Sequence, residues 1–272
     1  MRFLRFRVLS AARLLALFCA FAPAAQAKVD FTDIWQAEGG MESGWGVNFA
    51  QTGDFIFATF YIYGPNGAPV WYTAQLSRTT GDIFSGPVYA VTGTWFGAAD
   101  FVPVPPGNVV AVGDATFAAT NSHRGTLRYW IDTITVNKNI ERFTTVGLAV
   151  ADDYIDGVAG TNSGECPSGT GATFTQTMQF RVTQTMTNVV RIEFSGADST
   201  NVGQLMCAMQ GNALQYGKTL YVPGAAYQCT NGLATIAEIE SVRLLDDGIE
   251  AHWRANLGGS CVQRGRLAGV RQ

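Results

Sequence analysis

Two glutamates are of a type and spacing that could perform acid–base chemistry. Glu238 and Glu240 flank Ile239 in the segment ATIAEIESV, and on a strand side chains two positions apart project from the same face. Paired carboxylates carry out glycoside hydrolysis. They are also common on the solvated face of a half-buried strand, where they discourage edge-to-edge pairing. The solvated face is the interpretation that this spacing favours.

The two histidines of the chain are the other candidates for catalysis. His123 lies in the turn-like segment TNSHRG and His252 in EAHWR. The sequence contains neither the H-E-x-x-H metal motif nor the G-x-S-x-G nucleophile elbow. We therefore predict no catalytic residue, no metal site and no cofactor, and we expect the protein not to be an enzyme.

A third group of side chains could bind a ligand. The segment 42–72, ESGWGVNFAQTGDFIFATFYIYGPNGAPVWY, holds nine aromatic residues and five glycines. Aromatic side chains fill protein cores, and around a hollow they also stack on flat or apolar ligands. Both a filled and a hollow interior are compatible with the sequence. The candidate ligand-binding residues are Trp45, Asn48, Tyr61, Trp71, Tyr72 and Gln75.

The elements that must position these residues are strands. Val, Ile, Thr, Tyr and Phe recur between turn signals spaced about eight to fifteen residues apart, which predicts an all-β fold. The clearest hairpin is YGPNGAP, because Asn66-Gly67 can supply a positive φ. Residues 28–148 are expected to form about eight sequential strands that close into an antiparallel barrel in the style of lipocalins and avidins, with a sandwich as the competing architecture.

Cysteines mark out a second β domain at 165–272, after a linker at 149–164 that is rich in Asp, Gly, Ser and Asn. Cys166, Cys207, Cys229 and Cys261 all lie there. Their wide spacing favours two disulfides over a zinc site. Four cysteines allow three pairings. Our hypothesis pairs Cys166 with Cys261, joining the ends of the domain, and Cys207 with Cys229, joining neighbouring strands.

The first 27 residues have the pattern of a signal peptide: arginines, a short apolar stretch and AQA before Lys28. Cleavage after Ala27 predicts a secreted or periplasmic protein. The segment holds four of the 18 Lys and Arg and none of the 21 Asp and Glu, so its removal changes the net charge from −3 to −7. This acidic balance excludes nucleic acid as an expected partner. Short strands, Pro69 and the expected disulfides also argue against a membrane-embedded barrel.

Residues 42–72, followed by TGDIFSGPVYAVTGTWFG, resemble a module found in exported proteins of Gram-negative bacteria, which reads E-S-G-W-G-x-N, then Q-G-D-x-x-F-A-T-W. Phe60 stands where that module usually has Trp. The segments YQCTNGLATIAEIESVRLLDDGIEAHW and CVQRGRLAGVR resemble a cysteine-bearing domain that often accompanies it. The resemblance implies an exported, largely uncharacterised β protein and supplies no catalytic residues.

Three function classes remain after these observations. The first is non-catalytic binding of a small or glycan-like ligand by aromatic side chains. The second is a structural or protein-interaction module at the cell surface, which would show an exposed apolar patch. The third is a hydrolase using Glu238, Glu240 or a histidine, which would need a cleft around groups of perturbed pKa.

Overall fold

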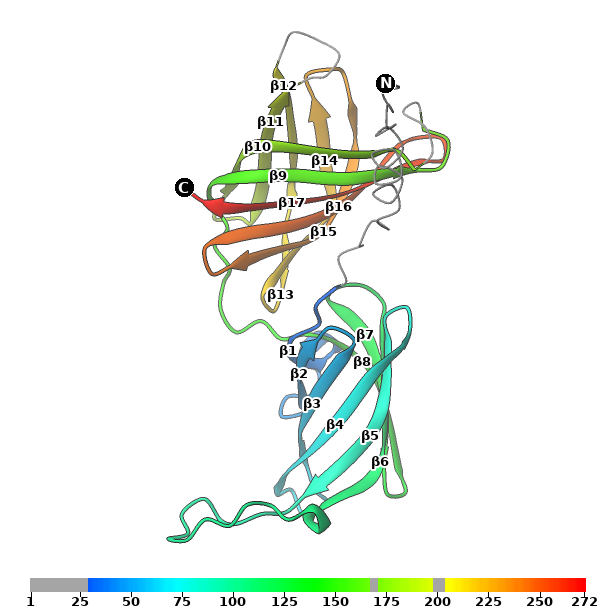
Figure 1. Ribbon diagram of the computed structural model, residues 1–272, viewed down its shortest axis with the longest axis vertical. Coiled ribbons are helices and arrows are strands. Elements are labelled where there is room, and N and C mark those ends of the chain that lie inside the picture. Colours follow the sequence, from blue (N-terminus) through cyan, green and yellow to red (C-terminus); the bar gives the residue numbers. More distant parts are fainter. Residues whose placement is uncertain (1–28, 167–170, 198–203) are drawn as a thin grey trace, which may run out of the picture.

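The computed structural model describes residues 29–166, 171–197 and 204–272. In these residues the chain forms 17 strands and two 3₁₀ turns. The strands make two antiparallel rings, an N-terminal barrel and a C-terminal ring, placed one beyond the other along the molecule (Figure 1). The predicted all-β fold class is confirmed. The predicted signal peptide lies outside the described residues.

The N-terminal barrel consists of eight strands in sequential order, closed by pairing of the first with the last. Trp35, Gln36 and Ala37 of the first strand pair with Arg142, Glu141 and Ile140 of the last. The strands are β1 (Asp33–Ala37), β2 (Gly46–Thr52), β3 (Phe55–Tyr63), β4 (Pro69–Thr80), β5 (Ile83–Val91), β6 (Val109–Ala119), β7 (Arg124–Ile131) and β8 (Ile134–Arg142), with 3₁₀ turns η1 (Glu38–Gly40) and η2 (Pro106–Asn108). The predicted hairpin at Asn66-Gly67 joins β3 to β4, and Gly67 has φ 74°.

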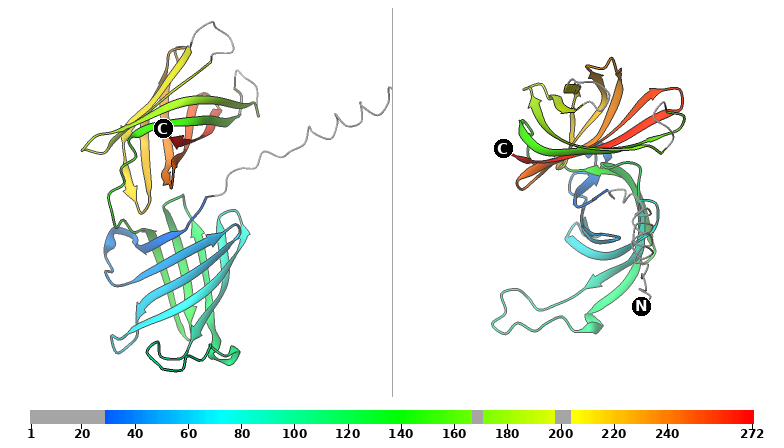
Figure 2. Two further views of the ribbon diagram at one scale, coloured as in Figure 1. Left: turned by 60° about the vertical axis from the view of Figure 1, so that its left-hand side comes forward. Right: turned by 45° about the horizontal axis from the view of Figure 1, so that its top comes forward.

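Strand β3 shows how the aromatic segment divides between two faces. Ile56, Ala58 and Phe60 point inward and are fully buried. Phe55, Phe57 and Tyr61 point outward and are 38–52% exposed. Because both faces of this strand carry apolar side chains, the sequence predicts that other parts of the protein or a partner cover the strand on both sides. The C-terminal ring lies at one end of the barrel and leaves these outer side chains uncovered (Figure 2).

The C-terminal ring has the order β12-β11-β10-β9-β17-β16-β15-β14-β13, with a further pairing of β12 to β14 that closes it. Cys207 and Cys229 are register partners on that closing seam and form a disulfide. The strands are β9 (Asp152–Ser163), β10 (Thr173–Gln184), β11 (Val189–Ala197), β12 (Gln204–Asn212), β13 (Leu214–Tyr216), β14 (Thr219–Cys229), β15 (Ala234–Leu245), β16 (Gly248–Gly258) and β17 (Cys261–Arg271).

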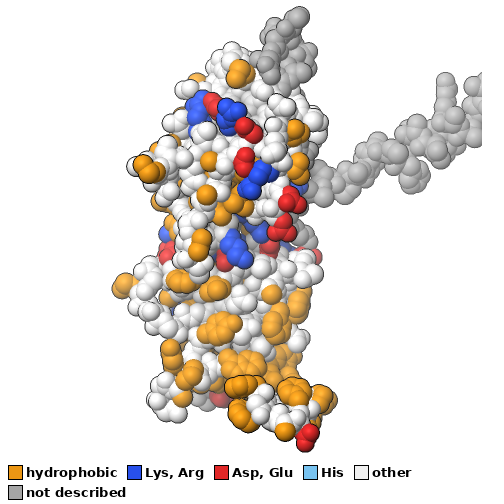
Figure 3. Space-filling view, turned by 90° about the vertical axis from the view of Figure 1, so that its left-hand side faces the viewer, with side chains coloured by type: hydrophobic (Ala, Val, Ile, Leu, Met, Phe, Trp, Pro, Cys, Tyr) orange, Lys and Arg blue, Asp and Glu red, His pale blue; other side chains and the backbone are white. Residues whose placement is uncertain are grey.

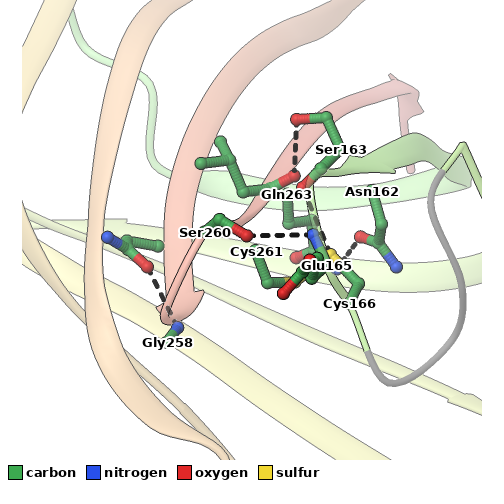
Figure 4. The surroundings of a disulfide bond; sticks show 10 residues. Asn162, Ser163, Glu165, Cys166, Gly258, Ser260, Cys261 and Gln263 are labelled. Carbon is green, nitrogen blue, oxygen red and sulfur yellow. Dashed lines mark hydrogen bonds between the residues drawn. A yellow bond between two sulfur atoms is a disulfide. The ribbon is translucent and has the colours of Figure 1, made fainter.

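The second disulfide joins Cys166, just after β9, to Cys261 at the start of β17 (Figure 4). Beside it the backbone N–H of Glu165 donates a hydrogen bond of 3.0 Å to Ser260 Oγ. Both predicted pairings are therefore confirmed. Two disulfides in this ring are typical of an oxidising, extracytoplasmic environment.

The predicted linker at 149–164 is wrong, because most of it forms β9. This strand pairs with β10 on one side and β17 on the other. Its glycines allow close packing: a Cβ at Gly160 would lie 2.3 Å from the Phe174 ring. The Asp and Gly content that suggested a linker reflects turn residues and close approach within a paired strand. The connection between the two rings is the shorter segment 143–151.

The two rings contact one another through a polar junction. Arg142 Nη1 lies 3.1 Å from Asp33 Oδ2, and both side chains are buried. The same Asp33 oxygen accepts a hydrogen bond of 3.1 Å from the backbone N–H of Lys218 in the C-terminal ring. No helix in the described residues is long and apolar enough to cross a membrane.

Candidate functional site

The interior of the barrel is filled at the end that faces the C-terminal ring, which we call the closed end. Phe117 packs against the rings of Phe31, Trp35 and Phe49, with centroids 4.9–5.3 Å apart. Phe31 precedes β1 and lies across the interior, and the Trp35 indole donates a hydrogen bond of 3.0 Å to its carbonyl. Edge and tilted ring contacts of this kind stabilise a packed core. The closed end has no room for a ligand among these rings.

The opposite end of the barrel, which we call the open end, contains a cavity of about 400 Å³. Four connections lie on this side of the barrel: 38–45, 64–68, 92–108 and 132–133. Ligand pockets in proteins are commonly of this size, mostly apolar, with a few polar groups. The cavity is lined by Trp45, Ile62, Tyr63, Gly64, Pro65, Val70, Tyr72, Tyr129, Ile131, Asp132, Ile134, Val136 and Lys138.

Two polar groups of the cavity are linked to each other. The Trp45 indole Nε1 donates a hydrogen bond of 3.0 Å to the Tyr129 hydroxyl. Burial raises the pKa of Tyr129, so the phenol stays protonated at neutral pH. In the described part of the chain, no acceptor takes the proton of this hydroxyl. Tyr129 can therefore donate a hydrogen bond to an acceptor atom in the cavity.

A charged pair stands at the edge of the same cavity. Lys138 lies on the inward face of β8, with its ammonium 5.2 Å from the centre of the Trp45 ring. It also pairs with the carboxylate of Glu42. The lysine is thus held by a cation–π contact and by a carboxylate. Because its charge is already paired, the site has no unpaired cation for an anionic ligand.

Of the six predicted ligand-binding residues, the structure brings two to this cavity, Trp45 and Tyr72. The other four, Asn48, Tyr61, Trp71 and Gln75, lie on the outer wall, because they alternate with the buried residues of β2, β3 and β4. Tyr61 and Trp71 are cross-strand partners there and are about half exposed. The prediction mixed two faces that strand alternation separates.

Sequence reasoning missed the lining residues on β7 and β8. Tyr129, Val136 and Lys138 follow the aromatic segment by about 60 residues or more and carry no motif of their own. The alternating pattern of RGTLRYWI marks Tyr129 as an inward residue. That pattern shows that Tyr129 faces inward, but it does not show which residue Tyr129 meets inside the barrel. The contact with Trp45, which directly precedes β2, arises only because closure of the ring brings β2 and β7 to the same cavity.

Of the two glutamates and two histidines, the structure brings Glu240 and His252 to the same cavities and leaves His123 elsewhere. Glu238 accepts a hydrogen bond of 2.8 Å from the Tyr221 hydroxyl. Glu240 lies at a β-bulge between Ile239 and Ser241, and burial and the neighbouring Glu238 raise its pKa. Glu240 and His252 line a small cavity of about 60 Å³ at the junction and also border a larger hollow of about 580 Å³ beside β9, β10 and β17. Arg264 and Arg266 line the same hollow.

His123 lies apart from these cavities, buried between the two rings. Its imidazole stacks on Tyr216 at 4.3 Å and contacts Tyr221 at 4.6 Å between centroids. Burial, with repulsion from Arg124 and Arg142, lowers the pKa of His123 to about 4. The residue is therefore a neutral packing group at the junction, in contact with aromatic side chains and not with an open cleft.

Comparison with known proteins adds no relative. No family model matches the chain, and a search of curated proteins finds no match. The resemblance to exported proteins of Gram-negative bacteria therefore stays a prediction, and the function must be argued from the site itself.

Proposed function

We propose that this protein is a non-catalytic binding protein for a small, largely apolar molecule that carries a hydrogen-bond acceptor. The single observation that supports this function is the cavity of about 400 Å³ at the open end of the barrel. Barrels of this strand number hold one small ligand in other proteins. The disulfides agree with a role in an oxidising compartment, and export by the N-terminal segment is part of the proposal.

The lining of the cavity favours an apolar molecule over a glycan. Ile62, Val70, Ile131 and Val136 offer no hydrogen bonds, whereas each sugar hydroxyl removed from water needs a partner. The polar contribution is concentrated at Tyr129, whose hydroxyl can orient one acceptor atom. A ligand with a ketone, ester or ether oxygen at one end of an apolar body matches this arrangement.

Native mass spectrometry of protein purified from its own source tests the proposal. We expect a reproducible extra mass that disappears on denaturation. Val136→Trp, which fills the cavity from the inward face of β8, should abolish it. Asn137→Trp is the matched control, because Asn137 is the next residue on the same strand and is exposed outward. A clean apo mass for the natural protein, or equal ligand retention in both variants, would contradict the proposal.

A second candidate function, a surface-interaction module, is favoured by a separate observation. Large apolar side chains are exposed on the outer wall and on the 92–108 connection. Monomeric proteins rarely expose extended apolar patches without a partner.

A further inference from the structure

The connection between β5 and β6, residues 92–108, forms an arm at the end of the molecule farthest from the C-terminal ring (Figures 1 and 2). We call it the aromatic arm. Trp95 is 67% exposed, Phe96 93% and Phe101 67%. Val102 and Val104 add further exposed apolar surface. An aromatic side chain in water forgoes the stabilisation of burial, so several on one arm indicate a surface that is covered in use.

Exposed aromatic side chains also lie on the outside of the barrel near this open end. They come from three of its eight strands, where they alternate with inward residues. We call this set the apolar belt, and its members are Tyr61, Trp71 and Trp130. Strands β3 and β4 are separated from β7 by β5 and β6 in one direction and by β8, β1 and β2 in the other, so the belt lies on two sides of the barrel and does not form one flat face.

Charged side chains are few where the exposed apolar side chains are many. The aromatic arm contains one charged residue, Asp100, and no lysine or arginine. Figure 3 shows Lys, Arg, Asp and Glu side chains over the C-terminal ring and the junction, and mainly hydrophobic side chains over the lower part of the barrel. On the face seen in Figure 3 the open end is therefore the less polar end of the molecule, and the aromatic arm has no basic cluster of the kind that attracts proteins to anionic lipid.

Exposed aromatic rings on two sides of one end, with an arm projecting beyond it, suit a fluid apolar phase better than a single protein partner. A rigid partner would have to contact the barrel wall at β3 and β4 and again at β7 to cover the belt. Trp and Tyr are the residues that anchor proteins in the interfacial layer of lipid, where an amphipathic ring lies between the headgroups and the acyl chains. The surface has this composition without the positive charge of an electrostatic anchor.

We propose that the open end of the barrel docks on a lipid surface, with the aromatic arm inserted among the headgroups and acyl chains. Trp95, Phe96 and Phe101 supply the inserted surface, and the apolar belt lies at the level of the headgroups. The interaction is apolar, so neutral and zwitterionic lipids suffice. Docking does not depend on whether the barrel cavity holds a ligand.

Flotation of the natural protein with phosphatidylcholine vesicles tests the proposal. We expect the protein to float with the vesicles, equally well at low and high salt. Trp95→Ser combined with Phe96→Ser should lower the partition coefficient at least tenfold. The matched control is Phe55→Ser combined with Phe57→Ser, which removes two exposed aromatic rings nearer the closed end and should leave flotation unchanged.

A second measurement locates the contact. Vesicles with brominated acyl chains should quench part of the tryptophan fluorescence, and that part should be missing in Trp95→Phe, which keeps flotation. Failure to float, flotation that requires anionic lipid, or equal flotation of the arm and control variants would overturn the proposal. Loss of a soluble dimer in the arm variant, seen by light scattering without vesicles, would assign the arm to a second copy of the chain instead. Val136→Trp should float normally, so failure of ligand binding and failure of docking are separate outcomes.

Discussion

The two rings of this protein close by short seams, and each seam is reinforced differently. In the barrel, β1 and β8 share three register pairs, and beside them a buried ion pair joins Arg142 to Asp33. In the C-terminal ring, β12 and β14 share four register pairs, and the Cys207–Cys229 disulfide crosses them. A few backbone hydrogen bonds stabilise a closure only modestly. A buried ion pair in the barrel and a disulfide in the C-terminal ring are therefore two alternative ways to stabilise ring closure.

The rings also differ in what closure leaves inside. The barrel concentrates its large aromatic side chains at the closed end and leaves a cavity at the open end. In the C-terminal ring large side chains lie over glycines: the Trp253 ring occupies the place where a Cβ of Gly265 would stand, 2.0 Å away. An uneven distribution of aromatic residues along a ring can thus create a binding site that an even distribution would fill.

The largest expected change in stability comes from removing the buried ion pair beside the β1–β8 pairing. Arg142→Met should lower the free energy of unfolding by about 3–5 kcal/mol, because it leaves the buried Asp33 carboxylate without its partner. Chemical denaturation followed by tryptophan fluorescence measures the change. Arg181→Met is the control, since Arg181 pairs with Asp153 at an exposed site and should leave the free energy of unfolding almost unchanged. Similar effects of the two substitutions would show that the buried pair does not support closure.

Breaking the covalent seam should have a somewhat smaller effect. Cys207→Ser combined with Cys229→Ser should lower stability by about 2–4 kcal/mol, since the crosslink restricts the unfolded chain. Native-state hydrogen exchange should show faster exchange in β12 and β14 and unchanged exchange in the barrel. Faster exchange in both rings would mean that the two rings unfold as one unit.

The junction between the rings should respond to pH through His123. Its pKa is about 4 in the folded protein and about 6.5 in a free chain, so the unfolded state binds the proton more readily. The stability that neutral His123 contributes is present above pH 6.5 and is lost as the pH falls toward 4. Between pH 7 and pH 4.5 the natural protein should lose about 1–3 kcal/mol more stability than His123→Phe. An identical loss in the two proteins would exclude His123 as the sensitive group.

The smallest expected effect is on ligand binding, and it tests whether the hollow interior of the barrel is a specific binding site. Tyr129→Phe should weaken binding of an aromatic ketone such as benzophenone by about three- to tenfold, the effect of one hydrogen bond. Binding of diphenylmethane, which lacks the acceptor oxygen, should not change. Isothermal titration measures both ligands, and equal weakening of the two would show that the hydroxyl does not orient the ligand.

Much of the fold could be predicted because its causes are local or compositional. Turn residues such as Asn66-Gly67 require special backbone angles wherever they occur, and Gly67 indeed has φ 74°. The disulfide pairing was a hypothesis chosen from the three pairings that four cysteines allow, on the expectation that one bond joins the ends of the domain and the other joins neighbouring strands. The segment 149–164 misled the same reasoning, because Asp and Gly also occur in a paired strand that packs closely against aromatic rings.

The sequence by itself determined the strands, the turns, the cysteine chemistry and the aromatic wealth of residues 42–72, since each depends on residues close together in the chain. Only the tertiary structure decided which of those aromatic residues face inward, because a strand with two apolar faces gives no preference between them. It also decided that the interior is filled at one end and hollow at the other. That outcome depends on which side chains ring closure brings together, as it does for Trp45 and Tyr129, 84 positions apart.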